Sequence, residues 1–306
     1  MALLLSTILL RPYVFVFLAA FLFGAVVNCG WRTTLLFMAL TYLVALAGEW
    51  SSIHNGFPFG LYHYDEATRG REIWVAGVPF FDSLSFTFLG FASYSTALLL
   101  AAPLYRDGRD LRVLDTWALR RSPRVWMMAA LLMVMVDTVV DPLSVRGDRW
   151  FLGHIFWYDP PGAHFGVPIS NYLGWFLVAA AVIAIFQLLD ARMSRGGRKP
   201  CGAVPGLPAR ALLGPLLYCG IVTFGITMLL RIGAAEIGWA SLCTYLPFLA
   251  FALHILTRRE TYGAGEAITR HLVDFPYNSA YVTAAPEAAV TARERPAATR
   301  SRRGRR

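Results

Sequence analysis

The chain has little lysine, little cysteine and little charge. Its one lysine among 306 residues is Lys199, and charged residues make up 15% of the total. Lys199 lies between two apolar runs, which excludes a retinal Schiff-base photoreceptor with its lysine in the last span. The four cysteines show no paired spacing, so neither a disulfide framework nor a zinc site is indicated. The six histidines form no box of metal-ligand spacing, and no metal site is expected.

Long apolar runs dominate the sequence instead. Hydrophobic residues make up 57% of the chain and the mean hydropathy is +0.51, as in polytopic membrane proteins. A helix needs roughly 20 apolar residues to cross a hydrocarbon core of about 30 Å. Seven runs reach or approach that length: 4–28, 33–50, 80–104, 125–142, 170–190, 210–230 and 237–257. We therefore predict an all-α membrane helix bundle of about seven spans over residues 1–257, with the first run interrupted at Arg11-Pro12.

The net charge of +9 is concentrated in three regions. Arginines crowd 106–124, 192–210 and the stretch after the last span, which are alternate connections of a seven-span chain. The positive-inside rule places these regions in the cytoplasm, with the amino terminus outside a bacterial-type cytoplasmic membrane. Residues 258–306 are expected to be a disordered cytoplasmic tail. Its charge indicates attraction to anionic membrane lipids rather than binding of nucleic acid.

Two acidic residues lie inside the fourth apolar run. Asp137 and Asp141 are four residues apart, which places both carboxyls on one helix face. A carboxylate at the centre of a membrane helix costs at least ~2.5–3 kcal/mol, so such residues are usually functional. The alternative is that the two aspartates only anchor hydrogen bonds between helices.

Further polar residues are expected on the same membrane face. Glu49 ends the second run, Asp82 opens the third and Asn171 opens the fifth. The adjoining loops 51–79 and 143–169 carry four of the six histidines, His54, His63, His154 and His164, and many aromatic residues. These groups predict a site roofed by the two loops. The loop residues also fit a plainer interpretation, because histidine, tyrosine and tryptophan commonly form hydrogen bonds at a membrane interface.

The same order of features occurs twice. Glu49 is followed by an aromatic and histidine-rich loop, then by Gly-Val-Pro at 77–79 and a new apolar run. Asp141 is followed by a loop of the same kind, then by Gly-Val-Pro at 166–168 and another run. We interpret this as a degenerate internal repeat whose halves face each other around a substrate site. Coincidence is the alternative, because Gly and Pro are common in turns.

Two stretches resemble a known family. The first is GFPFGLYHY at 56–64 with GVP at 77–79; the second is DTVVDP at 137–142, Trp150, Trp157 and GVPISNYLGW at 166–175. Over about residues 45–257 they resemble the integral-membrane carotenoid hydratases of the bisanhydrobacterioruberin and γ-carotene 1,2-hydratase type. Asp82 is a polar residue that this pattern does not lead one to expect. The resemblance implies addition of water to the terminal C1=C2 bond of an acyclic carotenoid, without a cofactor.

The chemistry of these residues also suits that reaction, independently of the resemblance. Hydration of an alkene needs a proton donor, shelter for a tertiary cation and a positioned water, and burial disfavours the charged form of a carboxyl. We predict catalytic roles for Asp141 and Asp137, with Glu49 as the reserve candidate. The predicted substrate-binding residues are Tyr62, His63, Tyr64, Asp82, His154, Trp157, Asn171 and Trp175. The expected partners are a lipid-soluble carotenoid, membrane lipids and other enzymes of carotenoid biosynthesis.

Three other functions remain open at this point. A membrane lycopene cyclase forms the same kind of cation and ends with ring closure instead of hydration. A prenyltransferase needs two aspartate-rich magnesium sites, and the sequence has one Asp-x-x-x-Asp pair. A transporter or carotenoid-binding protein fits the repeat without any chemistry.

The charge distribution predicts the location of the carboxyl terminus. A reporter fused after Arg306 that is active only in the cytoplasm should be active, because three basic regions favour that side. Fusions after residues 70 and 155, in the two long loops, serve as controls and should be inactive. Activity in the reverse pattern would contradict the predicted topology.

Overall fold

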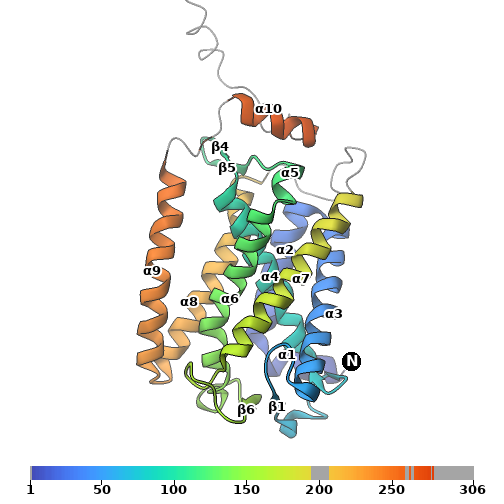
Figure 1. Cartoon of the computed structure of the whole chain (residues 1–306), viewed down its shortest axis with the longest axis vertical. Helices are drawn as coiled ribbons and strands as arrows, with labels where there is room; N and C mark the ends of the chain where they lie inside the picture. The colour runs from blue at the N-terminus through green and yellow to red at the C-terminus, as the bar shows by residue number, and fades with distance from the viewer. Residues whose placement is uncertain (1, 194–206, 259–261, 263–264, 277, 279–306) are drawn as a thin grey trace, which may run out of the picture.

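The computed structural model describes residues 2–193, 207–258, 262, 265–276 and 278 (Figure 1). Seven of its helices are long and apolar enough to cross a membrane, which confirms the predicted all-α membrane bundle. They are α2 (Pro12–Cys29), α3 (Trp31–Asn55), α4 (Phe80–Ala101), α6 (Pro123–Ser144), α7 (Ile169–Met193), α8 (Leu213–Arg231) and α9 (Ala235–Thr257).

Short elements connect these helices. They are α1 (Ala2–Leu10), β1 (Tyr62–Tyr64), η1 (Glu66–Thr68), β2 (Trp74–Val75), β3 (Val78–Pro79), β4 (Leu104–Asp107), β5 (Asp110–Val113), α5 (Trp117–Arg120), η2 (Gly147–Arg149), β6 (Phe156–Tyr158), η3 (Arg210–Leu212) and α10 (Gly265–Asp274). The first apolar run is divided between α1 and α2, as expected at Arg11-Pro12. Arg11 has a non-helical backbone with φ −127°, and Pro12, which lacks an N–H, starts the next helix.

Helix α4 forms the centre of the bundle. In its most apolar window 78% of the residues are buried, against 11% in α9. It packs against α2, α3, α6 and α8, whereas α9 lies at the edge and packs mainly against α8 and α6 (Figure 1). The polar residues carried on α4 therefore lie inside protein rather than against lipid.

The two ends of the bundle differ in their connections. Strands β1 and β6 lie at the end that also holds the amino terminus, and β4, β5, α5 and α10 lie at the other end (Figure 1). The aromatic loops and the basic connection 106–124 thus lie on opposite sides, as the alternation of charge predicts. The basic residues at 195–199 and the terminal 279–306 lie outside the described residues.

The internal repeat is visible in the backbone. In the first half Ala76 and Gly77 have φ +51° and +85° and join the paired residues Val75 and Val78. In the second half Phe165 and Gly166 have φ +53° and +97° and join the bridged residues His164 and Val167. Two successive positive φ values are the signature of a two-residue type I′ turn, for which glycine at the second position is favoured. Each Gly-Val-Pro is therefore the exit of the same tight hairpin into a long helix.

The two halves meet at the loop-covered end. Strand β1 pairs antiparallel with β6, with His63 opposite Trp157 at the centre of the ladder. Below this pair, α4 packs against α6 and α3 against α7, so each half contributes one helix to each contact. In each half the first helix runs toward the loop-covered end and the second runs away from it. The halves are therefore parallel repeats, related by an axis along the bundle.

Part of the carboxyl-terminal stretch is ordered, and the expectation of a disordered tail over 258–306 needs correction. Helix α10 packs Ile268 and Leu272 against Tyr105 and Leu114 of the β4–β5 region. The composition of the whole stretch concealed this short amphipathic segment, whose apolar residues recur at helical spacing.

A buried ion pair ties the amino terminus to the loop-covered end. The guanidinium of Arg11 donates to both carboxylate oxygens of Glu72, at 2.8 and 3.0 Å, and the two side chains are 2% and 0% exposed. Arg11 also donates to the Leu152 carbonyl and lies 4.5 Å from the centre of the Phe81 ring. One side chain thereby joins the α1–α2 junction to both repeat halves.

This pair should matter for stability. Arg11→Met leaves the Glu72 carboxylate buried without its partner, which should lower the free energy of unfolding by about 3–5 kcal/mol. Arg69→Met is the control, because the Arg69–Glu66 pair is 55% and 65% exposed and should contribute about 1 kcal/mol or less. Chemical unfolding of the purified protein in detergent measures both changes. Equal losses would show that the buried pair has no special role.

Candidate active site

A small cavity lies beneath the β1–β6 roof. It encloses about 290 Å³ and is lined by Glu49, Phe59, Tyr62, Asp82, Phe86, Asp141, Phe156, Tyr158, Asn171 and Trp175. These residues come from α3, α4, α6, α7 and the two aromatic loops. The predicted acids of both halves therefore share one site, rather than facing opposite sides of the bundle.

One amide holds the aspartate pair. Asn171 Nδ2 donates to Asp137 Oδ2 at 2.8 Å and to Asp141 Oδ2 at 2.6 Å, and all three residues are at most 7% exposed. Asp141 lines the cavity, whereas Asp137 lies behind it with its Oδ1 atom lacking a hydrogen-bond partner. The two carboxyls lie close together, because both accept from the same amide nitrogen. Helix α6 continues past Pro142 to Ser144, two residues beyond the fourth apolar run.

The first half supplies a second pair of acids. The Ser83 hydroxyl donates to Glu49 Oε2, and Glu49 is 2% exposed near the end of α3. Asp82 stands three residues after Pro79, just as Asn171 stands three residues after Pro168. The repeat thus explains Asp82: it is the counterpart of Asn171, with an acid in place of the amide.

Two tyrosines connect Asp82 to the roof. Tyr64 Oη donates to Asp82 Oδ2 at 2.6 Å, and the hydroxyl groups of Tyr62 and Tyr64 lie 3.2 Å apart. Burial, reinforced by the neighbouring carboxyls, raises the pKa of both Tyr62 and Tyr64 well above the usual value. Both phenols therefore stay protonated and serve as donors at physiological pH.

Four predicted substrate-binding residues do not line the cavity: Tyr64, which is buried and donates to Asp82, and three residues on the outside of the roof. Along β1 and β6 alternate side chains point to opposite faces, so His63 and Trp157 lie outside, where their rings pair at 5.6 Å. His154 is exposed and lies 3.2 Å from Asp65, whose pKa is lowered mainly by the backbone N–H of Ala67. These three residues belong to the outer surface of the roof.

The same alternation identifies residues that the sequence analysis missed. Phe156 and Tyr158 flank Trp157 and point inward with Tyr62 and Tyr64. Phe86 was also missed, and its ring stacks on Trp175 with centroids 4.4 Å apart. If each aromatic loop had been assumed to form a strand, in which alternate residues face the same side, Phe156 and Tyr158 would have been identified. Nothing in the sequence distinguishes Phe86 from the other phenylalanines of α4.

Gly174 allows the first loop to reach the second half. A Cβ atom at this position would lie 2.7 Å from the Pro58 carbonyl oxygen and 2.6 Å from the Phe59 ring. Glycine therefore permits the 57–60 segment to pack directly on α7. Phe59 consequently forms part of the cavity wall.

An apolar corridor leads away from the acids. It encloses about 700 Å³ between α2, α4, α6 and α8, and it shares Asp82, Asp141, Phe156 and Trp175 with the small cavity. Its wall carries the rings of Tyr13 and Phe224, stacked at 5.5 Å, with Phe17 edge-on to Phe224. These three rings are only half-buried, so they lie where the α2–α8 contact meets the lipid side of the bundle.

Residues 4–242 match the family described as "Carotenoid biosynthesis protein". The chain belongs to this family. Comparison with curated proteins and with solved structures found no match for it. Membership agrees with the resemblance seen in the sequence, and it assigns this membrane protein to carotenoid biosynthesis. The matched range contains every residue of the cavity and the corridor.

Among the described residues, no three His, Cys, Asp or Glu side chains are arranged to hold a metal ion. The polar groups of the site are instead paired with one another. Glu49 is bonded to Ser83, Asp82 to Tyr64 and the aspartate pair to Asn171. The site is thus a set of proton-carrying groups enclosed by aromatic rings.

The bridging amide gives a direct test of this arrangement. Asn171→Leu leaves oxygens of Asp137 and Asp141 buried without a donor, so the free energy of unfolding should fall by about 1–3 kcal/mol. Asn55→Leu is the matched control, because Asn55 is exposed and its hydrogen bonds can be replaced by water. The control should change stability by about 0.5 kcal/mol. Indistinguishable unfolding of the two variants would contradict the role given to Asn171.

Proposed function

We propose that the protein adds water to the terminal C1=C2 double bond of an acyclic carotenoid, giving a tertiary alcohol. One observation carries this proposal: Asp141 and Asp82 line both the small polar cavity and the apolar corridor. A rod-like polyene in the corridor would thus present its end to the carboxyls. The family supports the substrate class, and the residues support the type of reaction.

The proton comes from a carboxyl group. Asp141 is the proposed donor because it faces the cavity, and Asp137 behind it shares the Asn171 amide. The Asp141 O–H bond breaks as its proton forms a bond to C2, which leaves a tertiary cation at C1. Asp137 and Asn171 then stabilise the carboxylate that remains.

The cation needs shelter from side reactions. The stacked rings of Phe86 and Trp175 and the inward Phe156 border the place where it forms. Aromatic faces stabilise a positive charge through their quadrupoles and do not react with it. The cavity bordered by these rings, of about 290 Å³, also has room for the water that adds.

A positioned water completes the reaction. Tyr62 and Tyr64 offer hydroxyl groups beside Asp82, and Glu49 lies on the same wall. The water oxygen bonds to C1, and the proton it loses passes to a carboxylate, which restores the initial acid. The sum is alkene plus water to alcohol, with no change of oxidation state overall, so the reaction as written requires no redox cofactor.

The location of the site fits a substrate dissolved in the bilayer. We place the cavity at the non-cytoplasmic face and the entrance at the α2–α8 contact, where Tyr13 and Phe224 separate the corridor from lipid. A carotenoid entering there need not pass through water. Other enzymes of carotenoid biosynthesis working in the same membrane would supply and remove it.

The acids provide the decisive experiment. In a host that makes lycopene or γ-carotene, Asp141→Asn should abolish formation of the hydroxylated pigment and Asp137→Asn should reduce it strongly. An amide keeps the shape and most hydrogen bonds of the carboxyl but delivers no proton. Mass spectrometry of the pigments measures the outcome as the mass of one water for each hydrated end.

Controls separate chemistry from folding. Asp148→Asn makes the same exchange at an exposed residue of the second loop and should leave the yield unchanged. Retained expression of all three variants shows that insertion is intact. Near wild-type yields from both single variants and from the double variant would make the aspartates structural, and a product with unchanged mass but a new ring would indicate a cyclase.

A further inference from the structure

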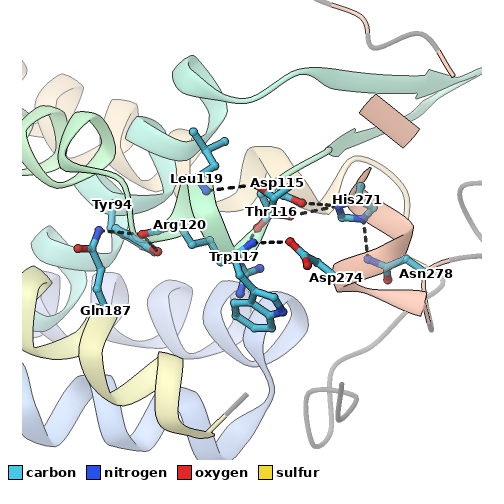
Figure 2. A network of polar contacts seen from close by, with 10 residues as sticks. All are labelled: Tyr94, Asp115, Thr116, Trp117, Leu119, Arg120, Gln187, His271, Asp274 and Asn278. Atoms are coloured by element: carbon cyan, nitrogen blue, oxygen red, sulfur yellow. Dashed lines mark hydrogen bonds and ion pairs between the residues drawn. The ribbon is translucent and has the colours of Figure 1, made fainter. Parts of the chain in front are cut away.

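A cavity larger than the corridor and the acid site combined lies at the end of the bundle opposite the acids. It encloses about 1270 Å³ between α2, α3, α4 and α7, and α10 closes one side of it. His271 Nδ1 lies 2.7 Å from the Asp115 carbonyl oxygen, and its Nε2 lies 3.0 Å from the Asn278 side chain, which fixes α10 over the rim (Figure 2). The proposed hydration uses no residue of this cavity.

The charged groups at the rim are already paired. Arg112 donates to Asp110 at 2.6 Å, and Arg120 donates to Asp115. Partners are also present for the remaining arginine and aspartate of the lining, Arg210 and Asp190. Three arginines thus balance three aspartates, and the described part of the rim offers no unpaired charge to an ionic ligand. A ligand that binds here is therefore expected to be uncharged, because burying an unpaired charge is costly.

Aromatic rings form the inner part of the cavity. Phe37 lies edge-on to Phe186 with ring centroids 4.9 Å apart, and Tyr94 lies edge-on to Phe186 at 5.7 Å. Phe91 lies 6.4 Å from Phe37, and all four residues line the cavity. Flat ring faces suit a flat conjugated chain, which also loses less conformational entropy on binding than a flexible saturated chain does.

Uncharged polar groups lie nearer the rim. Thr33 and Ser95 are half-buried residues of the lining, and their hydroxyl groups have no hydrogen-bond partner among the described residues. Asn28 Nδ2 donates to two backbone carbonyls, at 2.9 and 3.0 Å, which leaves its Oδ1 as an acceptor. Phe91 lies four residues before Ser95 on α4, so the aromatic part begins about 6 Å deeper in the bundle. A ligand that fits both parts has an apolar chain with a hydroxyl group at its end.

We propose that this cavity is a second binding site, which takes the hydroxylated end of an acyclic carotenoid. The tertiary alcohol formed in the proposed hydration has the required features: an uncharged hydroxyl group at the end of a rigid apolar polyene. The proposal rests on that function for the identity of the alcohol, whereas the site itself follows from the cavity. The hydroxyl group lies among Asn28, Thr33 and Ser95, and the chain lies between the aromatic rings.

Two sources can supply this hydroxylated end. It belongs either to a product molecule bound in addition to the substrate, or to the far end of a polyene whose other end lies at the acids. The corridor and this cavity come close along α4, where Leu89 lines the first and Phe91 lines the second. In the second case one polyene spans the bundle, and a carotenoid hydrated at one end is held with its free end at the acids.

Pigment binding to the purified protein tests the site. The full-length Asp141→Asn variant in dodecyl maltoside is titrated with lycopene or with lycopene that carries one tertiary hydroxyl group, and bound pigment per chain is measured by absorbance. This variant prevents conversion of the pigment during the titration. Hydroxylated lycopene should bind about tenfold more tightly than lycopene, because it forms additional hydrogen bonds. Dodecanol should compete only weakly, because its chain is flexible.

Matched variants locate the binding. Thr33→Val combined with Ser95→Ala should abolish the preference for hydroxylated lycopene, whereas Thr244→Val, at an exposed position of α9, should retain it. Cys29→Phe fills part of the cavity and should weaken binding of hydroxylated lycopene about tenfold, whereas Cys219→Phe on the exposed side of α8 should not. The first comparison tests the hydroxyl group and the second tests the chain, so a folding defect in one variant leaves the other decisive.

The number of bound pigments distinguishes the two sources. Two pigments per chain, of which Cys29→Phe removes one, identify a separate product molecule. One pigment per chain, lost both in Cys29→Phe and in Ser85→Phe of the corridor, identifies a single polyene that spans the two cavities.

Equal binding of lycopene and hydroxylated lycopene would overturn the proposal. A preference that is unchanged when Thr33→Val and Ser95→Ala are combined would also overturn it, as would dodecanol that competes as strongly as the pigment. Failure of the hydratase proposal is separate from these results, because it is decided by the pigment that the wild-type protein forms in the host.

Discussion

Carboxyl groups can lie inside a membrane bundle only if the protein supplies the hydrogen bonds that water would otherwise give. Here Asn171 donates hydrogen bonds to both Asp137 and Asp141. Ser83 donates to Glu49, and Tyr64 donates to Asp82. Each donor comes from a different segment than its acid, so the segments must meet at this point. The requirement to satisfy buried acids therefore determines how the roof and the helices come together.

The repeat provides the framework that meets this requirement. Each half delivers an acid at the end of one helix, turns through a two-residue hairpin and delivers a polar residue on the first turn of the next helix. The β1–β6 ladder then closes the two loops over a common cavity. Family membership assigns the protein to carotenoid biosynthesis, and the seven apolar helices fit a membrane protein, while the hydration proposed above rests on the arrangement of the acids.

Much of this arrangement could be predicted from the sequence because hydrophobicity and charge act locally. Seven spans, the acids and Asn171 followed from run lengths and from polar residues within apolar runs, whereas Trp175 came from the family resemblance. The outward direction of the His63 and Trp157 side chains could not be predicted, because it depends on which face of a short strand is covered. The corridor and the docking of α10 arise from contacts between distant segments, which no local pattern records.

The replacement of an acid by an amide between the halves has a consequence for stereochemistry. Asp82 and Asn171 occupy equivalent places, yet only one of them can carry a proton to or from a substrate. A substrate rotated by half a turn about the repeat axis would meet the Asn171 amide where it otherwise meets the Asp82 carboxyl. The two orientations of a substrate in the cavity are therefore chemically different, and under the proposed reaction they would not be equivalent.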